Sequence, residues 1–343
     1  MTERDTALCV PPKNEDVILV NKTMLAILKV LEKQPDTILG SRELSRQLKL
    51  HGIELTERTV RYHLRILDER GFTKVFGKEG RMITRKGREE LSQALVSEKV
   101  GFIISKIETL SYLTNFDLGT QEGNIILNIS YFPEERLKDA IKIMKPVFLS
   151  PYVMSDMIVL KKGGEKIGDV VIPDKQIGFG TVCSVTINGI FLKNGIPITS
   201  RFGGVLQIND EPQRFTALIG YEGSSVDPLE IFIKSRMTDV LGATKSHSGK
   251  ILASFREIPV VSIERAMQLR ENMKDKGIGG ILMTGNPNQP LLEMPVSMDK
   301  AGMIILGGLN PIAALEEAGI QTVSKAMSTL YKFSELMKFR ELL

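Results

Sequence analysis

Tryptophan is absent from this sequence of 343 residues, and only two cysteines and three histidines are present. Cys9 and Cys183 are far apart, which excludes the framework of disulfide bonds that holds small secreted proteins together. The histidines, at positions 51, 63 and 247, are too scattered to give the ligand spacing of a metal site. We therefore expect no metal ion, and we expect a reducing cytoplasm as the compartment.

Long apolar runs are missing as well. The most apolar stretch, residues 301–315, is shorter than the roughly 20 residues of a membrane span and is interrupted by Asn310 and Pro311. The first 17 residues are polar and mixed in charge, without the apolar segment of a secretory signal. The sequence therefore predicts neither a membrane partner nor a secretory signal.

The motifs of several enzyme classes do not occur, among them HExxH, GxSxG and the Walker sequence. Residues 242–250 (GATKSHSGK) resemble a phosphate-binding loop, but the first glycine is misplaced and a strand is expected to follow. Cys183 is either a small packed residue or a thiol nucleophile, and His247 is the one realistic base for the second role. We predict that the chain is not an enzyme and has no cofactor.

Charge is distributed unevenly along a chain of otherwise ordinary globular composition, with 42% hydrophobic and 25% charged residues. Residues 41–90 carry 13 lysines and arginines against 8 acidic residues, an excess of five positive charges. The rest of the chain carries 32 against 33 and is almost neutral. A local basic excess of this kind is expected of a segment that contacts nucleic acid.

The basic segment also has a recognisable order of elements. Apolar periodicity and turn residues predict helices over residues 22–34, 42–50, 57–70 and 85–95, and a hairpin over 72–83. Ser41, Thr56 and Thr84 are expected as helix caps, and Gly71 as the end of the third helix. This order is that of a winged helix-turn-helix, which we assign to residues 21–97 after a flexible tail over 1–20.

In such a domain the third helix enters the major groove and the hairpin, the wing, crosses the phosphates. Two alternatives stay open: the arginines form an ordinary solvated face, or the domain binds protein. His63 is expected to be packed or to face a phosphate. The residues predicted to contact double-stranded DNA are Arg46, Thr56, Arg58, Thr59, Arg61, Tyr62, His63, Arg65, Lys74, Lys78 and Arg81.

Residues 98–343 have a lower charge density, more glycine and more β-branched residues, which indicates a mixed α/β domain. Pro133 is expected at the first position of a helix and Ser262 as a helix cap, and a further helix should open at Asp227 and Pro228. Strands are predicted over residues 124–132, 157–162, 169–173, 205–208, 215–221, 250–259 and 279–285, and helices over 101–113, 133–144 and 263–277.

A weak internal repeat lies within this domain, because residues 177–196 align without gaps on residues 301–320. A duplicated unit would contain two similar helix N-termini approached by small residues, and such termini hold carboxylates or phosphates. The alternative is two tight helix–strand packings without a ligand. Arg201, in an apolar stretch, pairs either with an internal carboxylate or with an anionic ligand.

Four long segments then resemble one protein family. They are residues 181–208, 215–233, 249–259 and 307–320, and residues 58–71 (RTVRYHLRILDERG) are similar to the winged helix of the same family. The chain is thereby identified as a member of the NrpR family of archaeal nitrogen-responsive transcriptional repressors, over roughly residues 20–343.

The resemblance implies a repressor that binds palindromic operators as a homodimer or higher oligomer and blocks nitrogen-assimilation genes. It also implies that 2-oxoglutarate binds the regulatory domain and weakens DNA binding. Some members carry two tandem regulatory domains, whereas this chain has length for one. A second NrpR-type chain, or basal transcription factors, are therefore candidate partners.

Since 2-oxoglutarate is a dianion, it needs two positive or N–H-rich poles, and residue chemistry supplies candidates. A repressor that senses a different small acid or an amino acid, and a co-regulator that acts mainly through protein partners, remain the alternatives. The residues predicted to bind the ligand are Thr181, Cys183, Ser184, Ser200, Arg201, Gly203, Gly307 and Gly308.

Overall fold

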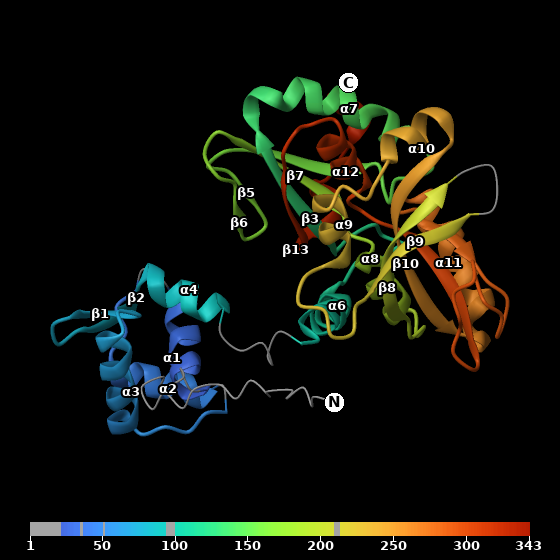
Figure 1. Ribbon diagram of the computed structural model, residues 1–343. Helices are drawn as coiled ribbons and strands as arrows, with labels where there is room; N and C mark the ends of the chain where they lie inside the picture. Colours follow the sequence, from blue (N-terminus) through green and yellow to red (C-terminus); the bar gives the residue numbers. More distant parts are fainter. Residues whose placement is uncertain (1–21, 35–36, 51, 94–99, 209–212) are drawn as a thin grey trace, which may run out of the picture. The chain divides into compact units, whose positions relative to one another are not determined.

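The computed structural model describes residues 22–34, 37–50, 52–93, 100–208 and 213–343. The tail predicted over residues 1–20 lies outside the described residues. Contacts between residues divide the chain into two compact units, Met1–Ser97 and Glu98–Leu343 (Figure 1). Each unit has its own hydrophobic core.

The first unit is a winged helix-turn-helix, as the sequence predicts. Thr56 caps the third helix by accepting a hydrogen bond from the Thr59 N–H (3.2 Å), and Thr84 caps the fourth in the same way from Gly87 (3.0 Å). The predicted cap Ser41 is instead the first residue of its helix. The elements are α1 (Lys22–Glu32), α2 (Ser41–Leu50), α3 (Glu57–Glu69), β1 (Thr73–Phe76), β2 (Gly80–Ile83) and α4 (Arg85–Gln93).

The core of this unit follows the predicted apolar stripes. Leu28 and Leu31 of α1 are buried with Leu44 and Leu48 of α2 and with the inner face of α3. The wing rests on this core through Gly80, because a side chain there would lie 2.3 Å from the Leu39 carbonyl oxygen. The inner face of α3 consists of Val60, Leu64 and Leu67.

The second unit is built on two five-stranded antiparallel sheets (Figure 1). One sheet has the order β11-β12-β10-β8-β9 and the other the order β13-β3-β7-β4-β14, and a small hairpin, β5–β6, stands apart. The strands are β3 (Asn124–Pro133), β4 (Met157–Lys162), β5 (Lys166–Ile167), β6 (Val170–Val171), β7 (Gln176–Val182), β8 (Thr199–Ile208), β9 (Arg214–Gly220), β10 (Gly249–Pro259), β11 (Ile281–Thr284), β12 (Lys300–Leu306), β13 (Val323–Lys332) and β14 (Met337–Lys338).

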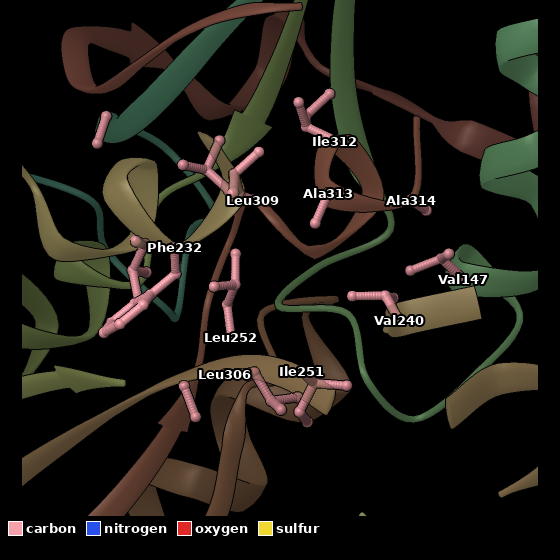
Figure 2. Close-up of a cluster of buried hydrophobic side chains, with 14 of the residues drawn as sticks. Val147, Phe232, Val240, Ile251, Leu252, Leu306, Leu309, Ile312, Ala313 and Ala314 are labelled. Carbon is pink, nitrogen blue, oxygen red and sulfur yellow. The ribbon is translucent and has the colours of Figure 1, made fainter. Parts of the chain in front are cut away.

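Helices pack against these sheets, and two of them are largely buried: α8 over residues 185–191 and α12 over residues 310–315. Figure 2 shows side chains of the α12 segment beside Leu252 of β10 and near Val147 of α7 and Val240 of α10. The helices are α6 (Phe102–Leu113), α7 (Leu137–Phe148), α8 (Val185–Lys193), α9 (Pro228–Lys234), α10 (Val240–Ser246), α11 (Ile263–Asp275) and α12 (Asn310–Glu317).

The order of elements supports the internal duplication. The series β3, α7, β4, β7, α8, β8 is matched by β10, α11, β11, β12, α12, β13. Strands β7 and β12 have the same length and begin 124 residues apart, and so do β8 and β13. The last strand of each repeat pairs with the first strand of the other, β8 with β10 and β13 with β3. The two repeats are therefore interlocked by exchanged strands.

Three local predictions in this unit are wrong. Pro133 ends β3, and α7 begins only at Leu137 after a 3₁₀ turn. Ser262 lies in the corresponding turn of the second repeat, where its hydroxyl donates to the Pro259 carbonyl (2.7 Å) and does not cap α11. Pro133 and Pro259 are the last paired residues of their strands. Helix α7 therefore starts one turn later than its sequence indicates, whereas α11 starts at Ile263, as predicted. The strand predicted over 169–173 is only two residues long.

Candidate functional site

The recognition helix α3 divides into a buried face and a cationic exposed face. Arg58, Arg61, Tyr62 and Arg65 are exposed, and Tyr62 keeps 62% of its surface accessible. Arg61 lies 3.3 Å from Glu57, and Arg65 3.1 Å from Glu69, in exposed pairs one helical turn apart. Such surface pairs contribute at most about 1 kcal/mol, so these guanidinium groups are available to phosphates and bases.

The residues around the start of α3 have more local roles. The hydroxyls of Thr56 and Thr59 lie 2.8 Å apart, and Thr56 also caps the helix. His63 is half-buried, with its ring edge-on to Tyr62 at a centroid distance of 5.2 Å. Burial lowers the pKa of His63, which favours its neutral form. On α2, Arg46 binds Glu43 through both Nε (2.8 Å) and Nη2 (2.6 Å) on the exposed surface.

The wing carries two exposed lysines and one anchored arginine. Lys74 and Lys78 are exposed, and the Lys74 ammonium lies 5.3 Å from the centroid of the Phe76 ring. Arg81 is only 21% exposed, because its Nε donates to Asp68 of α3 at 2.8 Å. This places Arg81 as a link between the wing and the recognition helix, while Lys74 and Lys78 present exposed ammonium groups.

The second unit, residues 98–343, is called the regulatory unit from here on. It contains a pocket of about 690 Å³ between α6 on one side and α8 and β8 on the other. Two of the eight residues predicted to bind ligand, Ser200 and Arg201, line it. The pocket has apolar walls with polar groups at several points. Its lining residues are Ile104, Ile107, Glu108, Ser111, Asn188, Leu192, Pro197, Ile198, Thr199, Ser200, Arg201, Phe202, Gly220 and Glu222.

Arg201 has an internal partner and an accessible surface at once. Its Nε lies 3.8 Å from Oε2 of Glu257, and its side chain remains 41% exposed. Glu257 is buried and accepts two hydrogen bonds from Ser297, from the backbone N–H (2.8 Å) and from the hydroxyl (3.0 Å). The guanidinium therefore satisfies the first sequence alternative, an internal carboxylate, while part of it still faces the pocket.

The other predicted ligand residues lie in the packed interior. Burial raises the pKa of the Cys183 thiol to about 11, so it remains protonated at neutral pH. A side chain at Gly308 would lie 2.2 Å from the Val182 carbonyl oxygen, and one at Gly307 would lie 2.7 Å from the Leu252 Cβ. Backbone packing thus explains these small residues without a ligand. The remaining members of the predicted set are Thr181, Ser184 and Gly203, and all of them are buried.

Sequence reasoning missed Arg256, which lies on β10 with 1% of its surface exposed. Its Nη1 donates to the Ser184 carbonyl oxygen (2.9 Å) and to Asn188 Oδ1, and its Nη2 donates to Ser184 Oγ (2.8 Å). Its Nε has no hydrogen-bond partner within the described part of the chain. The available signal was a charged Arg–Glu pair within an otherwise apolar strand.

Arg256 is connected to the pocket by one side chain. Asn188 accepts from Arg256 through Oδ1, and its Nδ2 donates to Ser200 Oγ at 3.1 Å. Asn188 and Ser200 both line the pocket. The buried positive charge of Arg256 is therefore one side chain away from the pocket surface formed by Asn188 and Ser200, where it favours an anionic group.

The described residues include no helix long and apolar enough to cross a membrane. Among the same residues, no group of three or more histidine, cysteine, aspartate or glutamate side chains is placed to hold a metal ion.

Comparison with known proteins gives two family matches. The family described as NrpR regulatory domains NRD1 and 2 matches residues 100–338, and the ribonuclease R winged-helix domain matches residues 25–91. The global nitrogen regulator NrpRI of Methanosarcina mazei is 36% identical over 318 residues, which cover 92% of this chain and 98% of that protein.

Two longer relatives are similar over part of their length. The global nitrogen regulators NrpR of Methanococcus maripaludis and Methanocaldococcus jannaschii are 32% and 30% identical, and the chain spans 54% and 56% of their lengths. A crystal structure of a nitrogen repressor-like protein from Methanococcus jannaschii aligns with a TM-score of 0.59 and 30% identity, covering 69% of this chain and 98% of that one.

Proposed function

The chain belongs to the NrpR family of global nitrogen regulators, and from this premise we propose that it is a sequence-specific DNA-binding repressor of nitrogen-assimilation genes. It is a transcriptional regulator and not an enzyme. The observation that carries the proposal is the exposed cationic face of α3 in a winged-helix unit that precedes a family regulatory domain.

On operator DNA, α3 enters the major groove, where Arg58, Arg61 and Arg65 reach base edges and phosphates. Lys74 and Lys78 of the wing contact the backbone, since their ammonium groups are exposed. A homodimer would present two such helices about 34 Å apart, which matches a palindromic operator. A second NrpR-type chain or basal transcription factors are further candidate partners.

The effector that we propose is 2-oxoglutarate, bound in the pocket between α6 and β8. Arg201 offers a partly exposed guanidinium to one carboxylate, and Ser200 and Asn188 offer polar groups backed by the buried Arg256 charge to the other. An effector acts only through a difference in affinity between two states, and a coupling of 1–3 kcal/mol changes operator affinity roughly 5- to 150-fold.

A second candidate effector is favoured by the acidic members of the same pocket. Glu108 and Glu222 line it together with Arg201, a charge pattern that suits a ligand with both an ammonium and a carboxylate. An α-amino acid has this chemistry, whereas a dianion is repelled by exposed carboxylates. The repressor would then sense an amino acid in place of 2-oxoglutarate.

Isothermal calorimetry separates the two candidates. Titration of 2-oxoglutarate and of glutamate into the full chain should show binding of the first, weakened at least tenfold by Arg201→Ala. The matched control is Arg214→Ala, which removes an exposed arginine of the same sheet outside the pocket. Binding of glutamate alone, lost in Glu222→Gln, supports the amino-acid effector. Equal affinity in Arg201→Ala and the wild type removes the pocket assignment.

A further inference from the structure

Helix α6 forms one wall of the pocket along most of its length. Ile104, Ile107, Glu108 and Ser111 line the pocket and have the spacing of a single helical stripe. Ile107 and Ser111 are buried, whereas Glu108 is exposed. The face that α6 turns to the pocket therefore extends over about two helical turns.

The same helix is the first described element after the residues that connect the two units. Helix α4 of the first unit ends at Gln93, and α6 begins at Phe102. Gly101 precedes it in a left-handed conformation with φ of 74°, and no side chain caps the helix. A glycine at that φ lets the chain change direction without strain at the start of α6.

Two contacts hold the first half of α6 to the rest of the regulatory unit. The Ile103 N–H donates to the Ser224 carbonyl oxygen (3.1 Å), between β9 and α9. The Lys106 ammonium donates to the Ala326 carbonyl oxygen (3.2 Å) in β13. The Ala326 N–H in turn donates to the Glu230 carboxylate of α9. Lys106 does not line the pocket.

Ala326 lies in an irregular part of β13. Pairing with β3 is interrupted between Lys325 and Thr329, and Met327 has a left-handed φ of 52° although it is buried. A bulky residue in that region is strained and persists only where neighbours hold it. Here the Met327 N–H donates to Asn128 Oδ1 at 3.1 Å. Lys106 therefore ties α6 to a strained bulge of β13.

The second half of α6 packs closely on α8 across Gly189. A side chain at Gly189 would lie 2.5 Å from the Thr114 Cβ and 3.0 Å from the Ser111 carbonyl oxygen. The end of α6 toward Thr114 is thus closely packed, while the first half is held by the burial of Ile103 in the core and by the hydrogen bonds of Lys106 and Ile103.

We propose that the position of α6 couples ligand binding in the pocket to DNA binding by the winged-helix unit. The hydrogen bond between Lys106 and the Ala326 carbonyl oxygen fixes that position. This inference rests on the proposed function, because it explains how an effector in that pocket would alter DNA binding. Ligand contacts along the pocket stripe favour one position of α6 on α8, and α6 is the described element of this unit that lies nearest in sequence to the winged-helix unit.

The test compares operator affinity with and without saturating 2-oxoglutarate, at fixed salt, in the full chain. Lys106→Met should leave the ligand affinity measured by calorimetry within about twofold of the wild type, since Lys106 is outside the pocket. The ratio of the two operator affinities should fall roughly 2- to 30-fold, the range seen for residues that carry coupling. Lys106→Arg, which keeps a donor for the Ala326 carbonyl, should restore most of the ratio.

The control is Lys142→Met, which removes an exposed lysine of α7 away from the pocket and should keep the wild-type ratio. If Lys106→Met leaves the ratio of operator affinities without and with ligand unchanged, the proposed role of α6 is wrong. A loss of ligand binding in that variant also overturns it. A wild-type chain whose operator affinity ignores the ligand overturns the proposed function and this inference together.

Discussion

The guanidinium of Arg81 in the wing binds the carboxylate of Asp68 in the recognition helix, with 2.8 Å between Nε and Oδ2. The other oxygen of Asp68 accepts from Thr73 Oγ1 at 2.6 Å, so one carboxylate holds both strands of the wing. Asp68 and Arg81 are mostly buried, with 17% and 21% of their side chains exposed. This carboxylate therefore fixes the wing against the recognition helix.

We expect Asp68→Ala to lower both stability and operator affinity. The variant leaves Arg81 partly buried without its partner, which costs about 1–3 kcal/mol. Chemical denaturation measures the first effect and a DNA shift assay the second. Glu69→Ala, which removes the exposed partner of Arg65, is the matched control and should change stability by less than about 1 kcal/mol. Equal effects of the two substitutions would argue against a role of Asp68 in fixing the wing.

The cationic face of α3 gives a second prediction. Simultaneous replacement of Arg58, Arg61 and Arg65 by alanine should abolish operator binding at moderate salt, while the fold is kept because all three are exposed. Each lost phosphate contact should also flatten the plot of log affinity against log salt by about 0.9. Fluorescence anisotropy over a salt series measures both. Retained operator binding would instead favour a co-regulator that acts through protein partners.

The buried guanidinium of Arg256 gives a third prediction. Arg256→Met should destabilise the chain by about 2–4 kcal/mol, since Ser184 and Asn188 lose their donor inside the core. Arg265→Ala, an exposed arginine that donates weakly to Asn194, should cost less than about 1 kcal/mol. Urea denaturation compares them. If Arg256→Met is as stable as the wild type, the buried network contributes no net stability.

Asp227 predicts a dependence of stability on pH. Burial raises the pKa of this carboxyl to about 6, well above its ordinary value, although its oxygen caps α9 by accepting from the Leu229 N–H. The folded state therefore keeps the proton to higher pH than the unfolded chain. Its stabilising contribution is present below about pH 4 and is lost as pH rises through about 6.

Asp227→Asn keeps the capping oxygen and removes the titration. The free energy of unfolding of the wild type should therefore fall relative to the variant by up to about 3 kcal/mol between pH 4 and pH 7. Glu230, whose pKa burial also raises, is present in both proteins. Denaturation curves measured across this range should diverge, and parallel curves would contradict the raised pKa.

The winged-helix unit could be predicted from sequence almost element by element, because its determinants are local. Apolar residues three and four apart mark the buried stripes, Thr56 and Thr84 are caps, and Gly71 follows the end of α3. Prediction placed Arg81 on the wing but gave no indication that Asp68, 13 residues earlier, binds it. That contact depends on how the hairpin folds back.

The regulatory unit was less predictable because its contacts are distant in sequence. Most strands were placed, and the offset of 124 residues pointed to the duplication. The exchange of β8 and β13 leaves no local pattern, and Arg256 meets Ser184 across 72 residues. Glycines such as Gly308 were interpreted as ligand contacts, yet the same sequence feature serves close backbone packing. Pattern alone does not separate these two uses.

We propose that a small acid in the pocket between α6 and β8 controls the affinity of α3 for DNA. The most direct measurement is the affinity of the purified full chain for an operator duplex at one fixed salt concentration, with increasing 2-oxoglutarate. We expect tight binding without the ligand and a saturable loss of affinity of roughly 5- to 150-fold with it. Operator affinity that stays constant over the whole titration, or no binding to duplex DNA at low salt, would contradict it.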